Sequence, residues 1–209
     1  SHFHSDHSYG VWQFSHAWIH PKDLELCYQA YSSEKLGDVW DTQQHLRHFC
    51  SRDEYRQHEC CPLSALKEDQ VFDLGGLTAQ VIPISGHTPG SIGLFLREKK
   101  LLLAGDAANP HFYLFFPYSL SLHEYSQNLE KVIRNVPFDS FVISHQQTIF
   151  PREQMELFLQ AALSASLNNS KIDPSLEKFH MGYPVYRHHV AAKDSRFVDS
   201  DIFFSRFQA

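Results

Sequence analysis

Three apolar segments of this 209-residue chain each run into a histidine or an aspartate, and this pattern constrains the fold more than any other. The segments and the polar residues that follow them are 77–84 with His87, 101–104 with Asp106, and 141–143 with His145. Short apolar runs of this length, bounded by turn residues, predict buried strands. Each predicted strand therefore delivers one metal-competent side chain at its C-terminal tip.

Four more side chains of the same kind lie in the first seven residues, which read Ser-His-Phe-His-Ser-Asp-His. Period-two spacing puts His2 and His4 on the same side of an extended segment, where they can bind one ion. Asp6 and His7 lie on the following turn and can reach a second ion. Imidazole and carboxylate ligands suit zinc, iron or manganese, and the lack of thiolate ligands favours an open site.

Seven ligands of the histidine and aspartate type match the needs of two adjacent divalent ions. Two ions about 3.5 to 4 Å apart share a hydroxide that is nucleophilic at neutral pH, while one of them polarises the electrophile. Asp106 is the candidate to bridge the two ions. This chemistry requires no serine or cysteine nucleophile.

The remaining pattern predicts a layered α/β protein without a strict βαβ repeat. Glycine pairs, capping signals and apolar periodicity predict its elements. We expect strands at 17–19 and 138–143, and hairpins at 71–74 with 77–84 and at 92–96 with 100–104. We expect helices at 21–30 and 151–167, and a third helix that begins at the Ser121-x-x-Glu124 capping box. In the helix after Ser121, an apolar stripe that includes Tyr125 is expected to be core. The length predicts a single domain over 1–209, in which the polar residues 38–68 form a lid or an insertion.

Composition excludes several classes of protein. The formal net charge of −6 lacks the basic stripe of a nucleic-acid-binding protein. No apolar run reaches the roughly 20 residues of a membrane helix, and no secretory leader is visible. The four cysteines are irregularly spaced and are expected to be free thiols. The sequence predicts a cytoplasmic enzyme with a small-molecule substrate and with neither nucleic acid nor membrane as a partner.

An aromatic stretch at 111–118 begins five residues after Asp106. The functional interpretation is an apolar wall for an acyl group or ring, formed by Phe112, Tyr113, Phe116 and Tyr118, in which a tyrosine hydroxyl donates to a developing oxyanion. The structural interpretation is that these rings fill the core or a homodimer interface. His111 and His123 are candidates to orient a metal ligand, with a solvated position as the alternative.

The order of these motifs resembles the ligand series of the metallo-β-lactamase superfamily. The resemblance is carried by His-x-His-x-Asp-His at 2–7, Gly-His-Thr-Pro-Gly-Ser at 86–91, Ala-Gly-Asp at 104–106 and His145, with similar flanks at 19–23 and 72–76. It implies an αββα sandwich with metals at one edge of two sheets. His2, His4 and His87 would hold the first metal, and Asp6, His7 and His145 the second, with Asp106 bridging.

Three features depart from the family pattern. Family members usually have several strands before the first motif, so the N-terminal part of the fold is expected to be missing from this chain. Tyr9-Gly10 stands where Gly-Gly is commoner, which reshapes the turn after His7. Ser144-His145-Gln146 stands where the family often has Gly-His-Gly, so a wider side chain borders the second metal.

The resemblance to glyoxalase II and lactonases implies a dinuclear hydrolase, with two zinc ions as cofactors, or iron or manganese in their place. It would cleave a thioester, ester, lactone or related bond by attack of a metal-bridging hydroxide, and Asp6 would position this nucleophile and shuttle its proton. One alternative is a persulfide dioxygenase with a single iron on His2, His4 and either His87 or Asp106. The other is a non-catalytic metal-binding scaffold.

Overall fold

The computed structural model describes residues 1–179 and 181–209. The chain divides into two compact units. The smaller unit is His2–Lys67, and the larger unit comprises Ser1 and Glu68–Ala209. The prediction that residues 1–209 form one domain stays a prediction.

The described residues of the larger unit form a six-stranded sheet and a four-stranded sheet. The six-stranded sheet has the order β3 (Val71–Asp73), β4 (Thr78–Pro83), β5 (Ile92–Leu96), β6 (Leu101–Gly105), β8 (Ser140–Ile143) and β9 (Ile149–Pro151). The four-stranded sheet has the order β10 (Lys171–Ile172), β11 (Tyr186–Val190), β12 (Ser200–Phe204) and β7 (His111–Leu114). Two pairs are parallel, β6 with β8 and β7 with β12, and the other pairs are antiparallel. Short 3₁₀ helices η3 (Arg97–Lys99) and η4 (Pro174–Phe179) lie between strands.

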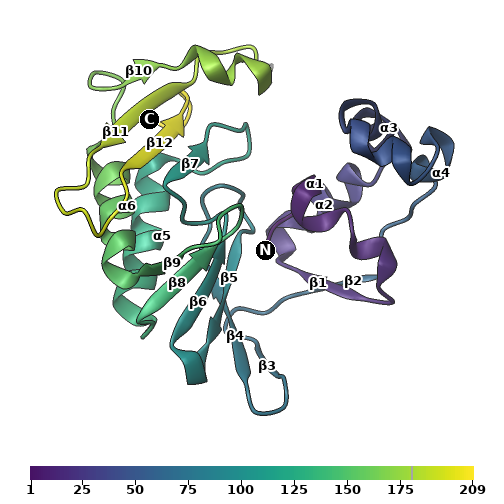
Figure 1. Ribbon diagram of the computed structural model, residues 1–209, viewed down its shortest axis with the longest axis horizontal. Helices are drawn as coiled ribbons and strands as arrows, with labels where there is room; N and C mark the ends of the chain where they lie inside the picture. Colours follow the sequence, from purple (N-terminus) through teal and green to yellow (C-terminus); the bar gives the residue numbers. More distant parts are fainter. Residues whose placement is uncertain (180) are drawn as a thin grey trace. The chain divides into compact units, whose positions relative to one another are not determined.

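The helices α5 (Leu122–Asn135) and α6 (Arg152–Ser164) lie side by side against the six-stranded sheet (Figure 1). Their apolar residues share one core with the facing residues of the sheet and with β7 and β12. The members of this core that are fully shielded from solvent include Ile84, Leu102, Ala104, Leu114, Leu129, Phe141, Met155 and Phe204. The helix stripe around Tyr125 is therefore core, as predicted.

The opposite face of the six-stranded sheet is also apolar. The pairing register places Val81, Leu94, Leu96, Leu101, Leu103 and Val142 on it. Sheets that are apolar on both faces suit a sandwich, in which one face packs on helices and the other on a second sheet. The predicted α/β class is confirmed, and the sheet with α5 and α6 corresponds to one half of the expected αββα arrangement.

Local signals predicted the elements around the site well. Gly75 and Gly76 adopt φ values of +76° and +92° and join β3 to β4, as the glycine pair predicted. The capping box at the start of α5 is present, because the Ser121 and Glu124 side chains each accept from the backbone amide of the other residue. Helix α6, which was predicted to span 151–167, ends at Ser164 because its C-cap residue Ala165 has an extended backbone.

The aromatic stretch was not predicted as a strand, but its first four residues form β7. This strand pairs with β12, which lies about 90 residues further along the chain, so no local pattern reveals it. His188 and His189 lie on β11, where His188 is buried and His189 is exposed.

The smaller unit consists of short helices and one pair of strands. Its elements are α1 (Ser5–Ser8), η1 (Val11–Gln13), β1 (Ala17–Ile19), α2 (Pro21–Ala30), α3 (Ser33–Thr42), η2 (Gln44–His48), α4 (Arg52–Arg56) and β2 (Leu63–Ala65). Strands β1 and β2 pair in parallel. The segment 38–68 thus contains the C-terminal half of α3 and all of η2, α4 and β2, and its role as a lid stays a prediction.

The four cysteines are free, as predicted. Burial raises the pKa of the Cys60 thiol to about 12, so this side chain stays protonated at neutral pH. In the part of the chain that the structure describes, no helix is long and apolar enough to cross a membrane.

A buried carboxylate organises the four-stranded sheet. Asp201 on β12 accepts from Arg187 Nε at 2.8 Å and from Nη2 at 2.9 Å. It also accepts from Nδ1 of His189 at 3.0 Å and from Nδ1 of His111 at 3.1 Å. Burial alone would raise the pKa of the Asp201 carboxyl, but the hydrogen bonds from Arg187 and His189 outweigh it and hold the pKa below its ordinary value.

Because the folded-state pKa of Asp201 is lowered, its contribution to stability is present above the unfolded pKa of about 3.9 and is lost as pH falls below that value. Asp201→Asn is expected to lower the free energy of unfolding by about 2 kcal/mol at pH 7 and to remove part of the loss below pH 4. Urea unfolding at pH 3 to 7 measures both effects. Asp139→Asn, which breaks an exposed pair with Lys100, is the control and should change little. An equal effect of both substitutions would contradict this account.

Candidate metal centre

A rigid turn after β4 presents His87. The Ile84 amide donates to the Ser91 carbonyl at 2.9 Å, and the Thr88 amide donates to Ser91 Oγ at 3.1 Å. The Ser85 hydroxyl donates to the Pro89 carbonyl at 2.8 Å. Because these bonds satisfy the polar groups of the turn internally, the backbone around His87 is held in one shape.

The hydrogen bond at Nδ1 sets the tautomer of the His87 ring. Nδ1 lies 2.6 Å from the Tyr113 carbonyl oxygen, and a carbonyl only accepts, so Nδ1 carries the proton. Nε2 is then the nitrogen with the lone pair, which is the form that binds a metal. The accepting carbonyl belongs to β7, where Tyr113 pairs with Phe203 of β12. The last strand of the chain thereby supports a candidate ligand in the middle of the sequence.

Asp106 and His145 lie close together in the larger unit. They follow β6 and β8, which are parallel neighbours, so both strands end at the same edge of the sheet. The Ser144 amide donates to the Gly105 carbonyl at 3.0 Å and ties the two turns together. His145 Nε2 lies 3.3 Å from Asp106 Oδ2. Two of the seven predicted ligands thus meet at a strand end.

Two residues at this edge adopt the left-handed backbone region. Gly105 has a φ of +58°, and a Cβ built on it would lie 2.8 Å from the Ser1 Cβ. His145 has a φ of +66°, which is uncommon for a residue with a side chain, although histidine tolerates it better than most. Backbone strain of this kind concentrates at functional sites, and here it falls on a predicted ligand.

The four N-terminal candidates lie close together within the smaller unit. His2 Nε2 is 2.9 Å from His4 Nδ1, and the rings of His2 and His7 have centroids 4.2 Å apart. Asp6 Oδ2 lies 3.7 Å from His7 Nε2, and both residues are in α1. Two ring nitrogens at such a short distance need a proton or a cation between their lone pairs. The predicted cluster of imidazoles is therefore formed.

Residues outside the motif hold this segment, and sequence reasoning missed them. Asp23 in α2 is buried, and its carboxylate accepts from the Phe3 amide at 3.3 Å. The Ser8 hydroxyl donates to the Phe3 carbonyl at 2.8 Å, and the Tyr31 hydroxyl donates to the Ser8 carbonyl at 2.6 Å. Burial raises the pKa of Tyr31, so its hydroxyl remains a donor. The only signal was that Asp23 belongs to the flank at 19–23.

The residues predicted to contact substrate take different positions. Phe112 lies in the core, where its ring stacks on Tyr125 with centroids 4.1 Å apart. Phe116 packs edge-on against His87 at 5.6 Å and stacks on Tyr118 at 5.5 Å. Tyr113 packs with Phe116 in a second apolar cluster that is built on Phe115, Leu176, Val185 and Phe203. Burial, together with the nearby Asp173 carboxylate, raises the pKa of Tyr113.

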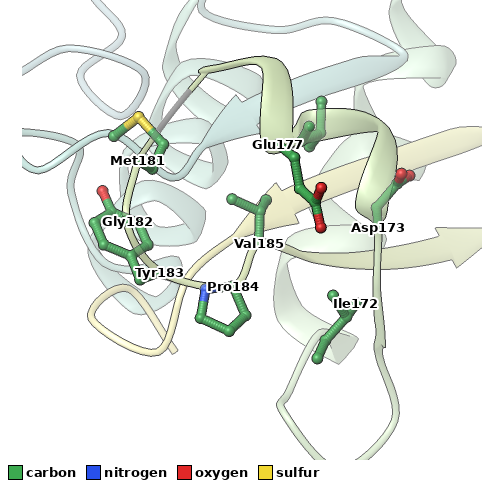
Figure 2. A pocket seen from close by; sticks show the side chains of 9 residues that line it. Ile172, Asp173, Glu177, Met181, Gly182, Tyr183, Pro184 and Val185 are labelled. Atoms are coloured by element: carbon green, nitrogen blue, oxygen red, sulfur yellow. The ribbon is translucent and has the colours of Figure 1, made fainter.

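A cavity of about 370 Å³ borders this second cluster and shares Leu176 and Val185 with it (Figure 2). Its lining is Ile172, Asp173, Leu176, Glu177, Met181, Gly182, Tyr183, Pro184 and Val185. In Figure 2 the Glu177 side chain reaches from η4 toward Val185. Among the described residues, none of the seven predicted ligands lines it, so the cavity is separate from the candidate metal centre.

His111 and His123 do not orient Asp106 through any contact that the structure gives. The His111 ring donates to Asp201, as described above, and the His123 ring lies 3.0 Å from Gln127 Nε2 on the surface of α5. His111 is close to Asp106 in the sequence, but it lies on β7 of the four-stranded sheet, where its ring faces Asp201 of the neighbouring strand β12.

The model of the metallo-β-lactamase superfamily matches residues 1–145, a range that contains all seven predicted ligands. This chain belongs to the metallo-β-lactamase superfamily. The resemblance inferred from the motifs is confirmed.

The chain is similar to the acyl-coenzyme A thioesterase MBLAC2 of Bos taurus and of Homo sapiens, each 26% identical over 141 residues. These matches cover 65% of this chain and 50% of each relative, so the chain spans about half the length of these curated relatives. It is 30% identical over 98 residues to a hydroxyacylglutathione hydrolase of Ruegeria pomeroyi, covering 46% of this chain and 32% of that protein. A solved metallo-beta-lactamase family protein of Thermus thermophilus, TTHA1429, aligns with a TM-score of 0.49 and 17% identity over 75% of this chain and 57% of its own.

Proposed function

We propose that this protein is a metal-dependent hydrolase that holds two zinc ions and cleaves a thioester. The observation that carries the proposal is the donor set. The larger unit brings a carboxylate and an imidazole within 3.3 Å of each other at one sheet edge, and the smaller unit gathers three imidazoles. Such donors suit zinc, with iron or manganese as the alternatives.

The candidate residues fit such a metal centre in the kind of side chain that they supply, and His87 also fits it in its tautomer. His87 presents Nε2 as its lone-pair nitrogen because Nδ1 donates to a carbonyl, which is the usual arrangement for a zinc-bound histidine. His2, His4 and His87 would hold one ion, and Asp6, His7 and His145 the other. Asp106 would bridge the two ions.

Ser1 and His2 are adjacent in the chain and belong to different units. Ser1 belongs to the larger unit, where its carbonyl accepts from the Ile92 amide at 3.0 Å and its Cβ would lie 2.8 Å from a Cβ built on Gly105. His2 is the next residue, and consecutive Cα atoms are about 3.8 Å apart. His2, the first residue of the smaller unit, is therefore covalently joined to a residue of the larger unit.

Two bound ions would supply an activated water and polarise the substrate carbonyl. The Asp6 carboxylate would orient the attacking water and take up its proton. Either Tyr113, whose raised pKa keeps its hydroxyl protonated, or Tyr118 would donate to the oxyanion as it develops. Phe116, which packs on His87, would line the pocket that receives the acyl group.

The names of the relatives support a thioester as the substrate class. One is an acyl-coenzyme A thioesterase and the other a hydroxyacylglutathione hydrolase, and both names describe removal of an acyl group from a thiol carrier. The other expectations, a cytoplasmic location, a small-molecule substrate and a homodimer, are part of the same proposal.

The test is thiol release from acyl-coenzyme A and acylglutathione substrates, followed with a thiol reagent before and after metal removal by a chelator. We expect release to stop on complete metal removal and to return with zinc or manganese. Release that persists without metal would contradict the proposal. Oxygen consumption with a persulfide substrate and bound iron would instead favour the dioxygenase alternative.

A further inference from the structure

Two turns that carry candidate ligands rest on one buried aromatic side chain. Tyr125 lies on the second turn of α5 and is 1% exposed. A Cβ built on Gly86 would lie 2.3 Å from Tyr125 Cδ2, so the ring packs directly against the backbone that precedes His87. This approach is possible only because residue 86 is glycine.

The opposite end of the same side chain reaches the second turn. Tyr125 Oη lies 3.2 Å from the Ala107 carbonyl oxygen, and Ala107 follows Asp106. Burial raises the pKa of Tyr125, so the hydroxyl stays protonated, and it must donate because the carbonyl only accepts. The bond is buried, where an unsatisfied carbonyl would be costly.

The face of the ring makes a third connection. It stacks on Phe112 with an interplanar angle of 9°, and the next residue, Tyr113, supplies the carbonyl that accepts from His87 Nδ1. The position of the Tyr125 ring therefore affects three things. These are the backbone of His87, the carbonyl that accepts the His87 ring proton, and the backbone of Asp106. Asn128 on the next turn of α5 donates to the Ser85 carbonyl at 3.1 Å, which is a second contact from this helix to the first turn.

We propose that Tyr125 is a positioning residue that fixes the spacing between the His87 turn and the Asp106 turn of the metal centre. The inference rests on the proposed function. It extends that function, because it makes one residue of α5 responsible for the distance between the ligands that follow β4 and β6. Metal affinity depends steeply on such support, since loss of outer partners typically weakens it by about 10- to 100-fold.

Tyr125→Phe tests the proposal, because it keeps the ring and its stacking and removes only the hydroxyl. Leu129→Ala is the matched control. Leu129 is fully buried one turn further along α5, and its loss creates a cavity in the same core. A merely structural role for Tyr125 would make the two variants behave alike.

The first readout is amide hydrogen exchange of the metal-free protein at two turn bonds, Gly86 to the Thr88 carbonyl and Ala107 to the Ala104 carbonyl. In Tyr125→Phe we expect exchange at both amides to rise about 3- to 10-fold relative to the Phe95 amide in β5, which is the effect of one lost hydrogen bond. In Leu129→Ala the three amides should change together. Unchanged ratios in Tyr125→Phe would overturn the proposal.

The second readout is Co²⁺ binding, followed by visible absorption. Tyr125→Phe should raise the dissociation constant about 10-fold and alter the absorption spectrum, while Leu129→Ala should leave both unchanged. Equal constants in the wild type and Tyr125→Phe would overturn the positioning role. If the wild type bound no Co²⁺ while exchange at both turns responded as expected, the proposed function would fail and with it the role at a metal, although the mechanical coupling of the turns would stand.

Discussion

His87→Ala is expected to lower kcat/KM for thioester hydrolysis by about 100- to 1000-fold. The substitution removes a proposed ligand whose lone pair is set by a 2.6 Å hydrogen bond to the Tyr113 carbonyl. Each tenfold loss in rate corresponds to about 1.4 kcal/mol of transition-state stabilisation, and loss of one electrostatic partner of a reacting oxygen typically costs two to three such steps. The measurement is steady-state thiol release at matched protein concentration, with metal content determined for each variant.

The control for this prediction is His123→Ala, because His123 is an exposed histidine of the larger unit whose ring lies 3.0 Å from Gln127 Nε2 of its own helix. It should keep wild-type kcat/KM and metal content. Asp106→Ala should match His87→Ala, since it removes the proposed bridging carboxylate. Full hydrolysis by either ligand variant at full metal loading would show that the mechanism is wrong.

Gly86→Ala is expected to have the second-largest effect, although it adds a single methyl group. Its Cβ would lie 2.3 Å from Cδ2 of the Tyr125 ring, which is buried in the core and stacks on Phe112. Overpacking of this kind typically costs about 1 to 3 kcal/mol of unfolding free energy. Because the shift falls on the backbone before His87, we also expect kcat/KM to fall about 100-fold, as misplacement of a reacting group by 1 Å can do.

Gly75→Ala separates the two effects. Gly75 has a φ of +76°, and a Cβ there would meet nothing within 4 Å, so the substitution strains the β3–β4 turn without a clash. The left-handed conformation costs a side chain about 1 to 2 kcal/mol. We expect this variant to lose stability in urea titrations and to keep its activity. Wild-type activity and stability in Gly86→Ala would contradict the packing account.

The parts of the fold that the sequence predicted are those encoded by local chemistry. The glycine pair before β4 and the capping box at Ser121 act within a few residues, so both features and their elements were predicted correctly. The ligand motifs are also local patterns, and the structure brings Asp106 close to His145 and His2 close to His4, as the spacing suggested.

The parts that escaped prediction depend on pairing between distant residues. The aromatic stretch at 111–118 was assigned no strand, because β7 forms only by pairing with β12 near the end of the chain. Asp201 and Asp23 look like ordinary acidic residues in the sequence, and their roles come from donors on other elements. Tyr125 was recognised as core, but no pattern shows that its ring and hydroxyl reach two different turns.

The most direct test of the central claim is the number and identity of metal ions per chain, measured by elemental analysis on protein purified without chelators or a histidine tag. The account predicts about two zinc or manganese ions per chain, falling in His87→Ala and in Asp106→Ala but not in His123→Ala. A single iron would contradict the dinuclear hydrolase and favour oxygen chemistry. No bound metal in an active protein would show that the histidine and aspartate residues at these turns do not form the catalytic centre.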